Sequence, residues 1–560
     1  MKNTTEATWW RAGLVFATTS LVGCIGDIGD RAPGSSHAPS GGGSTSPTGG
    51  PDPGAQACEE HDCSNVVDAV VVPMLAESGL ELTEEDNAIL CRRMAIDLTG
   101  LAPTLEEAEA HCAGHDPKEM AAYFMDKPSN AAAVDGTPPY VFVNRRFWSR
   151  LFTYDVGTVE HTFYADIRDL DQQVADLYAG AIHYDEFVTR VLAHPAFLKR
   201  FGAYYGEGYP EKVALRAALV FLGRDLLPVE AANLANLWRA WITVLFDDAL
   251  TLPLYPDCPT GAIEGDIPCT HWHFGLDGSR CAGPKVPACQ SDVLGVAEMI
   301  PEASAYTPRE ELSANDLEML RVPGQLFVAQ PELAQQAADM ALAKYLGWWK
   351  AGIYKPTFDV PAVRAALAEK FVADGYDVRK LDFEIVTSVL YTQAARRTPS
   401  ANVPLWAFGP TKHLPAVVWL DQMLPAIGTG YGVYDFRFGN AKWWPGHFEQ
   451  YGPLNVYRIP LQQDIGDDGG LISVFTRRGV LEETCNANGV DPAASPEALI
   501  DRAFAGGLGR AATPGEKATL LQELGAEGAD GCPDLASCDR SQLAIALCRS
   551  LYMTSTFTYY

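Results

Sequence analysis

The spacing of apolar residues along most of this chain follows the helical period. Apolar side chains recur three and four positions apart, which places them on one face of a helix. Strand-like patterns are confined to two short stretches, 70–72 and 454–459. The sequence therefore predicts a mainly α-helical protein, with helices at 87–98, 105–113, 213–222, 229–246, 331–349, 360–373, 496–504, 514–523 and 540–553.

One pattern at a helix boundary occurs twice. Leu-Gly-Arg, three residues, Pro, one residue and Glu stand at 222–230 and again at 508–516, and a looser copy without the Arg stands at 95–107. A Gly after an apolar helix is a common helix end, and Pro followed by Glu is typical of the next first turn. We therefore expect helix-corner-helix units in which the following residues are structural: Gly100, Gly223, Arg224, Glu230, Gly509, Arg510 and Glu516.

The charged residues of these corners allow two interpretations. Arg224 and Arg510 can bind the last carbonyl groups of the preceding helix, or they can bind an anion. In the first unit, Arg93 and Asp97 are four residues apart on one helix, a spacing that favours an ion pair, and Asp97 can also cap the corner. The segment that begins at Thr513 predicts a capping box with Glu516.

A second signature follows each corner, with steps of four, three and three residues that end on an aromatic residue. These steps keep one helical face, so we expect each aromatic side chain to enter a core. Uneven insertions between the copies favour divergent repeats of one helical module with long irregular insertions over a regular solenoid. The three copies are 187-191-194-197, 381-385-388-391 and 547-551-554-557.

The N-terminus has the features of a bacterial export signal. Lys2 and Arg11 precede an apolar run at 12–22, which is too short to span a membrane in the mature protein. The run ends in Leu-Val-Gly-Cys, which resembles a lipobox, so Cys24 is the predicted lipidation site, a palmitate-carrying anchor. An ordinary secretory signal with a chance Cys is the alternative. Ile25 in place of Asp favours the outer membrane.

Composition then divides the rest of the chain. Residues 25–57 are rich in Gly, Ser and Pro and are expected to form a disordered tether. The remaining length suffices for two or three domains. We expect an N-terminal helical domain at 58–205, a middle helical domain at 206–395 with a Cys-rich insert at 252–305, and a C-terminal domain at 396–560.

Cysteine usage indicates the compartment of the protein, and net charge argues against some classes of partner. Thirteen Cys minus the lipidated one leave an even number, which suits disulfides in an oxidising compartment. The sequence has 71 acidic and 42 basic residues, a net charge of −29, which argues against nucleic acid and against charge-driven binding to anionic lipid. Many connectivities are open; pairing of neighbours gives Cys58 with Cys63, Cys91 with Cys112, Cys258 with Cys269, Cys281 with Cys289, Cys532 with Cys538 and Cys485 with Cys548.

The stretch at 90–107 carries a family resemblance. Its Arg92-Arg93, its Asp97-Leu98-Thr99-Gly100-Leu101 and its Pro103-Thr104 resemble the opening motif of large secreted proteins of planctomycetes, which are often fused to cytochrome-c-like domains. Segments near 380–560 resemble the C-terminal companion domain. The resemblance implies an exported helical protein of unknown biochemical role. The chain has no Cys-x-x-Cys-His, so no covalent haem site is encoded, and electron transfer would require a separate cytochrome.

Two segments have side chains suited to metal ions. His271 and His273, with Asp277 nearby, can bind Zn²⁺ or Cu²⁺ through imidazole, although a disulfide-closed surface insert with exposed His is the preferred interpretation. The second segment is an acidic, glycine-rich loop whose carboxylates suit Ca²⁺, or which is simply a solvated turn. Its candidate ligands are Asp464, Asp467 and Asp468.

Polar-tipped aromatic residues are concentrated at 437–451. Exposed rings of this kind stack on sugars, and the same rings can also close a core. The candidate ligand-binding residues are Arg437, Trp443, Trp444, His447 and Tyr451.

These features lead to one functional hypothesis and two alternatives. The first is a lipid-anchored envelope protein that binds a partner protein or a polysaccharide. The alternatives are a metal-dependent envelope enzyme, hydrolytic or redox, and an accessory to a separate cytochrome. The sequence has no nucleophile-elbow or phosphate-binding fingerprint, so no cofactor is predicted beyond the candidate Ca²⁺ or Zn²⁺.

Overall fold

The computed structural model is mostly helical, as the apolar pattern predicts, and residues 52–560 form one compact unit. The structure describes residues 53–128, 137–152, 165–195, 197–198, 211–227, 230–231, 234–235, 238, 309–347, 349–350, 353–356, 360–395, 405–410, 412, 485, 491, 493–526 and 539–552.

Helices of seven to fifteen residues make up nearly all of the ordered elements. Two 3-10 turns, η4 (Arg309–Glu311) and η5 (Leu405–Ala407), and a short hairpin of β1 (Trp349–Lys350) and β2 (Ile353–Pro356) complete the set in the described residues. The helices are α1 (Pro53–Glu60), α2 (Asp68–Glu77), α3 (Asn87–Thr99), α4 (Leu105–His111), α5 (Pro117–Asp126), α6 (Pro139–Leu151), α7 (Ala165–Tyr178), α8 (Tyr184–Leu192), α10 (Glu211–Phe221), α14 (Ala314–Val328), α15 (Glu332–Leu346), α16 (Pro361–Ala373), α17 (Val378–Val386), α18 (Val389–Thr392), α23 (Pro496–Leu508), α24 (Pro514–Ala526) and α25 (Arg540–Tyr552).

Helix ends lie where local chemistry predicts them. The Asp86 side chain accepts from the backbone N–H groups of Ala88 and Ile89 at the start of α3. Left-handed glycines end the helices of all three predicted corners, with φ of 76° at Gly100, 62° at Gly223 and 66° at Gly509. The predicted capping box of α24 is also present, since Thr513 and Glu516 exchange hydrogen bonds. The repetition of the whole module stays a prediction.

Two local predictions were wrong. Residues 70–72 lie inside α2 and not in a strand, because Val71 and Val72 pack into the core from one side of that helix. The helix expected to reach residue 349 ends at Leu346, because Gly347 adopts φ of 70°. The chain then enters the β1–β2 hairpin, which the sequence pattern did not indicate.

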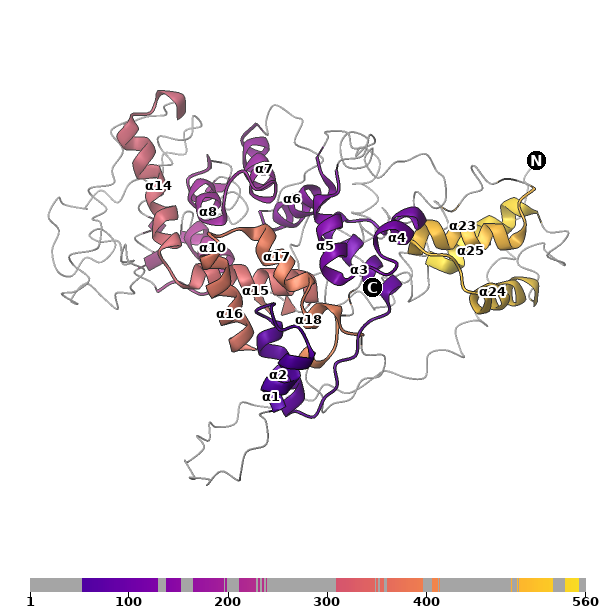
Figure 1. Ribbon diagram of the computed structural model, residues 1–560. Helices are drawn as coiled ribbons and strands as arrows, with labels where there is room; N and C mark the ends of the chain where they lie inside the picture. The colour runs from indigo at the N-terminus through magenta and orange to yellow at the C-terminus, as the bar shows by residue number, and fades with distance from the viewer. Residues whose placement is uncertain are drawn as a thin grey trace, which may run out of the picture. The chain divides into compact units, whose positions relative to one another are not determined.

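The core runs through the first two predicted domains without a break. One apolar cluster extends from Val67 to Ala407 and includes residues from both sides of the predicted boundary at 205. At its centre, α15 contacts α10, α16 and α17 (Figure 1). The domain boundaries stay predictions, but the segments 58–205 and 206–395 share one apolar interior.

The aromatic signatures place their rings in this core without being continuous helices. Phe197 and Tyr391 are fully buried. Helix α8 ends at Leu192, before its aromatic residue, and the second copy is divided between α17 and α18. The last two positions of the third copy, 554 and 557, lie outside the described residues.

Three disulfides have the predicted partners. Cys58 pairs with Cys63 and Cys91 with Cys112, which are neighbouring cysteines, and Cys485 pairs with Cys548, the pair that neighbour pairing leaves over. The Cys91–Cys112 bridge joins α3 to the end of α4, on either side of the first corner. The other three predicted pairs lie outside the described residues.

Candidate functional site

The residues predicted to carry chemistry fall outside the part of the chain that the structure describes. This applies to the lipidation site, the imidazole and carboxylate candidates for metal binding, and the aromatic segment. The residues concerned are Cys24, His271, His273, Asp277, Arg437, Trp443, Trp444, His447, Tyr451, Asp464, Asp467 and Asp468. Their roles stay predictions.

Neither a metal-binding cluster nor a membrane-spanning helix is present among the described residues. No group of three or more His, Cys, Asp or Glu side chains is arranged to hold a metal ion there. Among the same residues, none of the helices has the length and apolar character required to cross a membrane.

The two Arg-containing corners have the same internal contacts. Arg224 Nη1 donates to Glu230 Oε2 at 3.0 Å, and Arg510 Nη2 donates to Glu516 Oε1 at 2.7 Å. Each arginine also donates to the carbonyl of the residue that follows it. These bonds run forward to the next helix, whereas the sequence argument expected them to run back to the helix just ended. The bond from Arg510 lowers the pKa of Glu516 to about 2.

Arg93 links the start of the body to a distant segment. Its Nη2 lies 2.8 Å from Glu85 Oε2, and its Nη1 donates to the backbone oxygens of Tyr391 at 2.7 Å and Gln393 at 3.2 Å. Both charged side chains are buried, with exposed fractions of 1% and 8%. The expected Arg93–Asp97 pair is therefore wrong, because the guanidinium is turned toward Glu85 and these carbonyls.

Asp97 takes part in a second buried pair. Its Oδ2 accepts from Lys412 Nζ and, at 2.7 Å, from the Tyr391 hydroxyl. Burial lowers the pKa of Lys412 to about 8, against the opposing effect of Asp97. Lys412 lies against Gly347, where a Cβ atom would stand 2.7 Å from the lysine Cγ. Asp97 thus joins α3 to residues far along the chain.

A third polar cluster lies where α6, α15 and α17 meet. Lys344 Nζ on α15 lies 2.6 Å from Asn144 Oδ1 on α6 and 3.2 Å from Asp382 Oδ2 on α17. The same carboxylate oxygen accepts from the hydroxyls of Tyr140 at 2.8 Å and Tyr345 at 2.6 Å. The cluster therefore places one amine within hydrogen-bond distance of both a carboxamide and a carboxyl group.

Aromatic rings surround this lysine. Lys344 Nζ lies 4.2 Å from the ring centroid of Tyr345, 5.7 Å from that of Tyr178 and 5.9 Å from that of Phe147. Burial lowers the pKa of Lys344, although Asp382 acts in the opposite direction. Lowered pKa is how proteins turn a lysine into a nucleophile, because only the neutral amine has a free electron pair.

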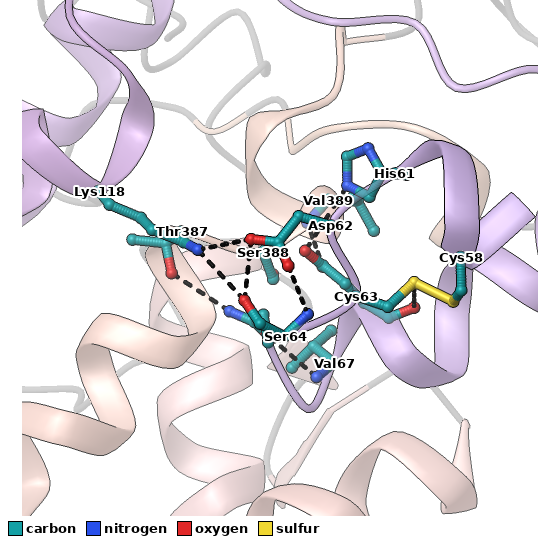
Figure 2. A network of polar contacts seen from close by, with 12 residues as sticks. Cys58, His61, Asp62, Cys63, Ser64, Val67, Lys118, Thr387, Ser388 and Val389 are labelled. Atoms are coloured by element: carbon teal, nitrogen blue, oxygen red, sulfur yellow. Dashed lines mark hydrogen bonds and ion pairs between the residues drawn. A yellow bond between two sulfur atoms is a disulfide. The ribbon is translucent and has the colours of Figure 1, made fainter.

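A partly exposed polar network holds the start of the body against the α17–α18 turn. Figure 2 shows this network, with Lys118 on one side and the loop closed by the Cys58–Cys63 disulfide on the other. Lys118 Nζ lies 3.0 Å from Asp62 Oδ2 and 3.3 Å from Ser64 Oγ. Such a pair resembles a Ser–Lys nucleophile, but the hydrogen bond to Asp62 raises the pKa of Lys118. The lysine stays charged at neutral pH and cannot act as the base.

Behind this loop, Asp68 caps α18. Its Oδ1 accepts from the Val389 backbone N–H at 2.7 Å, and its Oδ2 lies 3.8 Å from His61 Nε2. Burial raises the pKa of Asp68 to about 6, while the Val389 hydrogen bond and His61 oppose the shift. Asn65 adds hydrogen bonds to the Glu384 oxygen at 2.7 Å and to Thr387 Oγ1 at 3.2 Å.

The sequence analysis did not identify the polar side chains that connect these helices. Asn144, Lys344, Asp382 and Lys412 belong to none of the motifs. One sequence signal was available, because Lys344 stands among apolar residues of a predicted helix. The structure buries most of that helix, and an unpaired charge is costly there. Its partners are 200 residues before it and 38 residues after it, so the sequence alone did not identify them.

Comparison with known proteins adds one partial match. Residues 66–200 match the model of the PSCyt2 family, described as a protein of unknown function (DUF1549). The matched stretch contains the first corner, Arg93, Asp97 and Asn144. No curated protein matches the chain, and no solved structure matches it.

Proposed function

We propose that this chain is a lipid-anchored protein of the bacterial outer membrane that binds a partner protein or a polysaccharide. The observation that carries the proposal is the set of three disulfides within the described residues. Disulfides persist in the periplasm and at cell surfaces and are rare in the cytosol. They support export, which the N-terminal signal and the lipobox at Cys24 require.

The internal contacts favour a scaffold. The buried charges of the described body pair across helices that are distant in sequence, as in Arg93 with Glu85 and Lys412 with Asp97. Such buried pairs have a structural role, so we place ligand binding in other segments of the chain. The aromatic residues at 443–451, between the described positions 412 and 485, are our proposed ligand-binding segment.

The anchor is tested by membrane partition of the full chain expressed in a Gram-negative host. Cys24→Ala should move the protein from the membrane fraction to the soluble fraction, because no acyl group can be attached. Cys58→Ala with Cys63→Ala is the matched control, since it removes other cysteines and should leave the partition unchanged. Unaltered membrane association of Cys24→Ala would refute the anchor.

Binding is tested by retention on immobilised envelope polysaccharides. Retention of the wild type that disappears in Trp443→Ala with Trp444→Ala would support the proposal. Val372→Ala on α16 is the control, because it removes an apolar side chain that is 47% exposed in the described body. Retention that survives the double tryptophan substitution would exclude this segment as the binding site.

A metal-dependent activity is the second candidate, and the observation in its favour is the pair His271 and His273 separated by one residue. Elemental analysis of protein purified without chelator tests it. One transition-metal ion per chain, lost in His271→Ala with His273→Ala, would support this candidate, whereas metal-free folded protein would remove it.

A further inference from the structure

The Asn144–Lys344–Asp382 cluster brings together the groups needed for an amide bond. Lys344 supplies a primary amine, Asn144 supplies a carboxamide carbon, and Asp382 supplies a carboxyl group that can carry a proton. The amine lies 2.6 Å from the amide oxygen and 3.2 Å from Asp382 Oδ2. Reacting groups held this close have effective concentrations far above those in solution.

Burial shifts the Lys344 amine toward its neutral form. Asn144 is completely buried, the Lys344 side chain is 11% exposed and the Asp382 side chain 4%. Apolar surroundings disfavour the charged ammonium form of Lys344, because a buried charge loses its hydration. Burial indeed lowers the pKa of Lys344. A neutral lysine amine is a competent nucleophile.

Hydrogen bonds hold the other two groups in place. Asn144 Nδ2 donates to the Tyr140 backbone oxygen at 2.9 Å, which turns the amide oxygen toward Lys344. The Tyr140 and Tyr345 hydroxyls both donate to Asp382 Oδ2 and fix the carboxyl group beside the amine. The arrangement is therefore preorganised by two helices in addition to the one that carries the nucleophile.

We propose that Lys344 and Asn144 become joined by an intramolecular isopeptide bond. Lys344 Nζ attacks Asn144 Cγ, the new C–N bond forms, the bond from Cγ to Nδ2 breaks, and one ammonia leaves. Asp382 accepts the proton that the amine loses, and that proton is returned to the departing nitrogen. No oxidant, nucleotide or metal is consumed, because one amide replaces another.

The bond would connect α6 to α15 and close a loop between residues 200 positions apart. It would join the segment that matches the PSCyt2 family model to the central helix of the core. Unlike the three disulfides, it would survive reducing conditions, so the body would keep one covalent connection when its disulfides are opened.

Mass spectrometry of the full chain tests the proposal. Folded protein is reduced, alkylated and digested with trypsin, which cannot cleave after an acylated lysine. We expect one branched peptide that contains residues 144 and 344, lighter than its two separate components by one ammonia. Separate peptides with an unmodified Asn144 and a free Lys344, from folded wild-type protein after prolonged incubation, would overturn the proposal.

Substitutions test which side chains form the isopeptide bond. Asn144→Asp should give the same branched peptide by loss of water, because the product amide is identical. Lys344→Arg should abolish the branched peptide, and Asp382→Asn should slow its formation in protein that remains folded. Lys118→Arg is the matched control, since its amine contacts Asp62 and Ser64 and no carboxamide in the described residues. A branched peptide that persists in Lys344→Arg would refute the assignment, and the wild-type digest decides the question even if a variant does not fold.

Discussion

Arg93 Nη1 lies 2.7 Å from the backbone oxygen of Tyr391, although the two residues are 298 positions apart in the chain. The arginine stands in the stretch that matches the PSCyt2 family model, and Tyr391 stands on α18, well beyond it. Glu85 neutralises the same guanidinium. The matched stretch therefore pairs this buried charge within itself, and a segment outside it supplies two further hydrogen-bond acceptors.

The pairing of Arg93 predicts a large loss of stability on substitution. Arg93→Met leaves Glu85 buried without its cation and two carbonyls without their donor, so the free energy of unfolding should fall by about 3–5 kcal/mol. Urea unfolding followed by circular dichroism measures the change. Arg321→Met is the control, because its pair with Glu186 is exposed at the surface and should contribute at most ~1 kcal/mol. Equal effects of the two substitutions would contradict the role of burial.

Asp68 predicts an unusual pH dependence of stability. Its pKa is about 6 in the folded state against the ordinary aspartate value of 3.8, so the folded state holds the proton more tightly. This contribution to stability is fully present below pH 3.8 and is lost as the pH rises through 6. The total loss is about 3 kcal/mol, since each pKa unit corresponds to ~1.4 kcal/mol.

Asp68→Asn removes the ionisation while its amide oxygen can still accept from Val389. We expect the variant to be more stable than the wild type at pH 7.5 and the difference to shrink toward pH 4, as measured by urea unfolding at both pH values. The control is Asp62→Asn, whose wild-type pKa is lowered by Lys118, so its effect should have the opposite sign. A variant that is less stable than the wild type at pH 7.5 would refute the prediction.

Substitution of the two corner arginines should lower the free energy of unfolding by unequal amounts. Arg224 and Glu230 have exposed side-chain fractions of 12% and 1%, whereas those of Arg510 and Glu516 are 28% and 35%. Arg224→Ala leaves the buried Glu230 carboxylate without its cation and should lower the free energy of unfolding by about 3 kcal/mol. Arg510→Ala exposes its partner to water and should cost ~1 kcal/mol or less. Thermal melts of both variants check the order, and a larger effect at Arg510 would show that the corners are not held by burial.

We expect the contributions of the three disulfides to the free energy of unfolding to follow the lengths of the loops that they close. The loops between paired cysteines span 63, 21 and 5 residues for Cys485–Cys548, Cys91–Cys112 and Cys58–Cys63. Chain entropy of the unfolded state then assigns losses of about 4, 3 and 2 kcal/mol to the three double-alanine variants. Guanidinium unfolding in the absence of reductant measures them. A Cys58–Cys63 variant less stable than the other two would mean that native contacts of its loop dominate.

The sequence by itself determined the features that depend on a few neighbouring residues. A glycine ends a helix through its own φ, so Gly100, Gly223 and Gly509 were recognisable, as was the capping box at Thr513. Neighbouring cysteines paired because a short chain keeps them close, as in Cys91 with Cys112. These signals are local and act with any tertiary arrangement.

Only the tertiary structure decided which distant charges meet. Four-residue spacing favoured Arg93 with Asp97, yet packing placed Glu85 beside Arg93 and Lys412 beside Asp97. Lys344 received Asn144 and Asp382 from two other helices, at separations where no local pattern applies. Burial is the physical reason: a charge that cannot reach water must be paired by whatever the core places next to it, and that choice is made by the packing of whole helices.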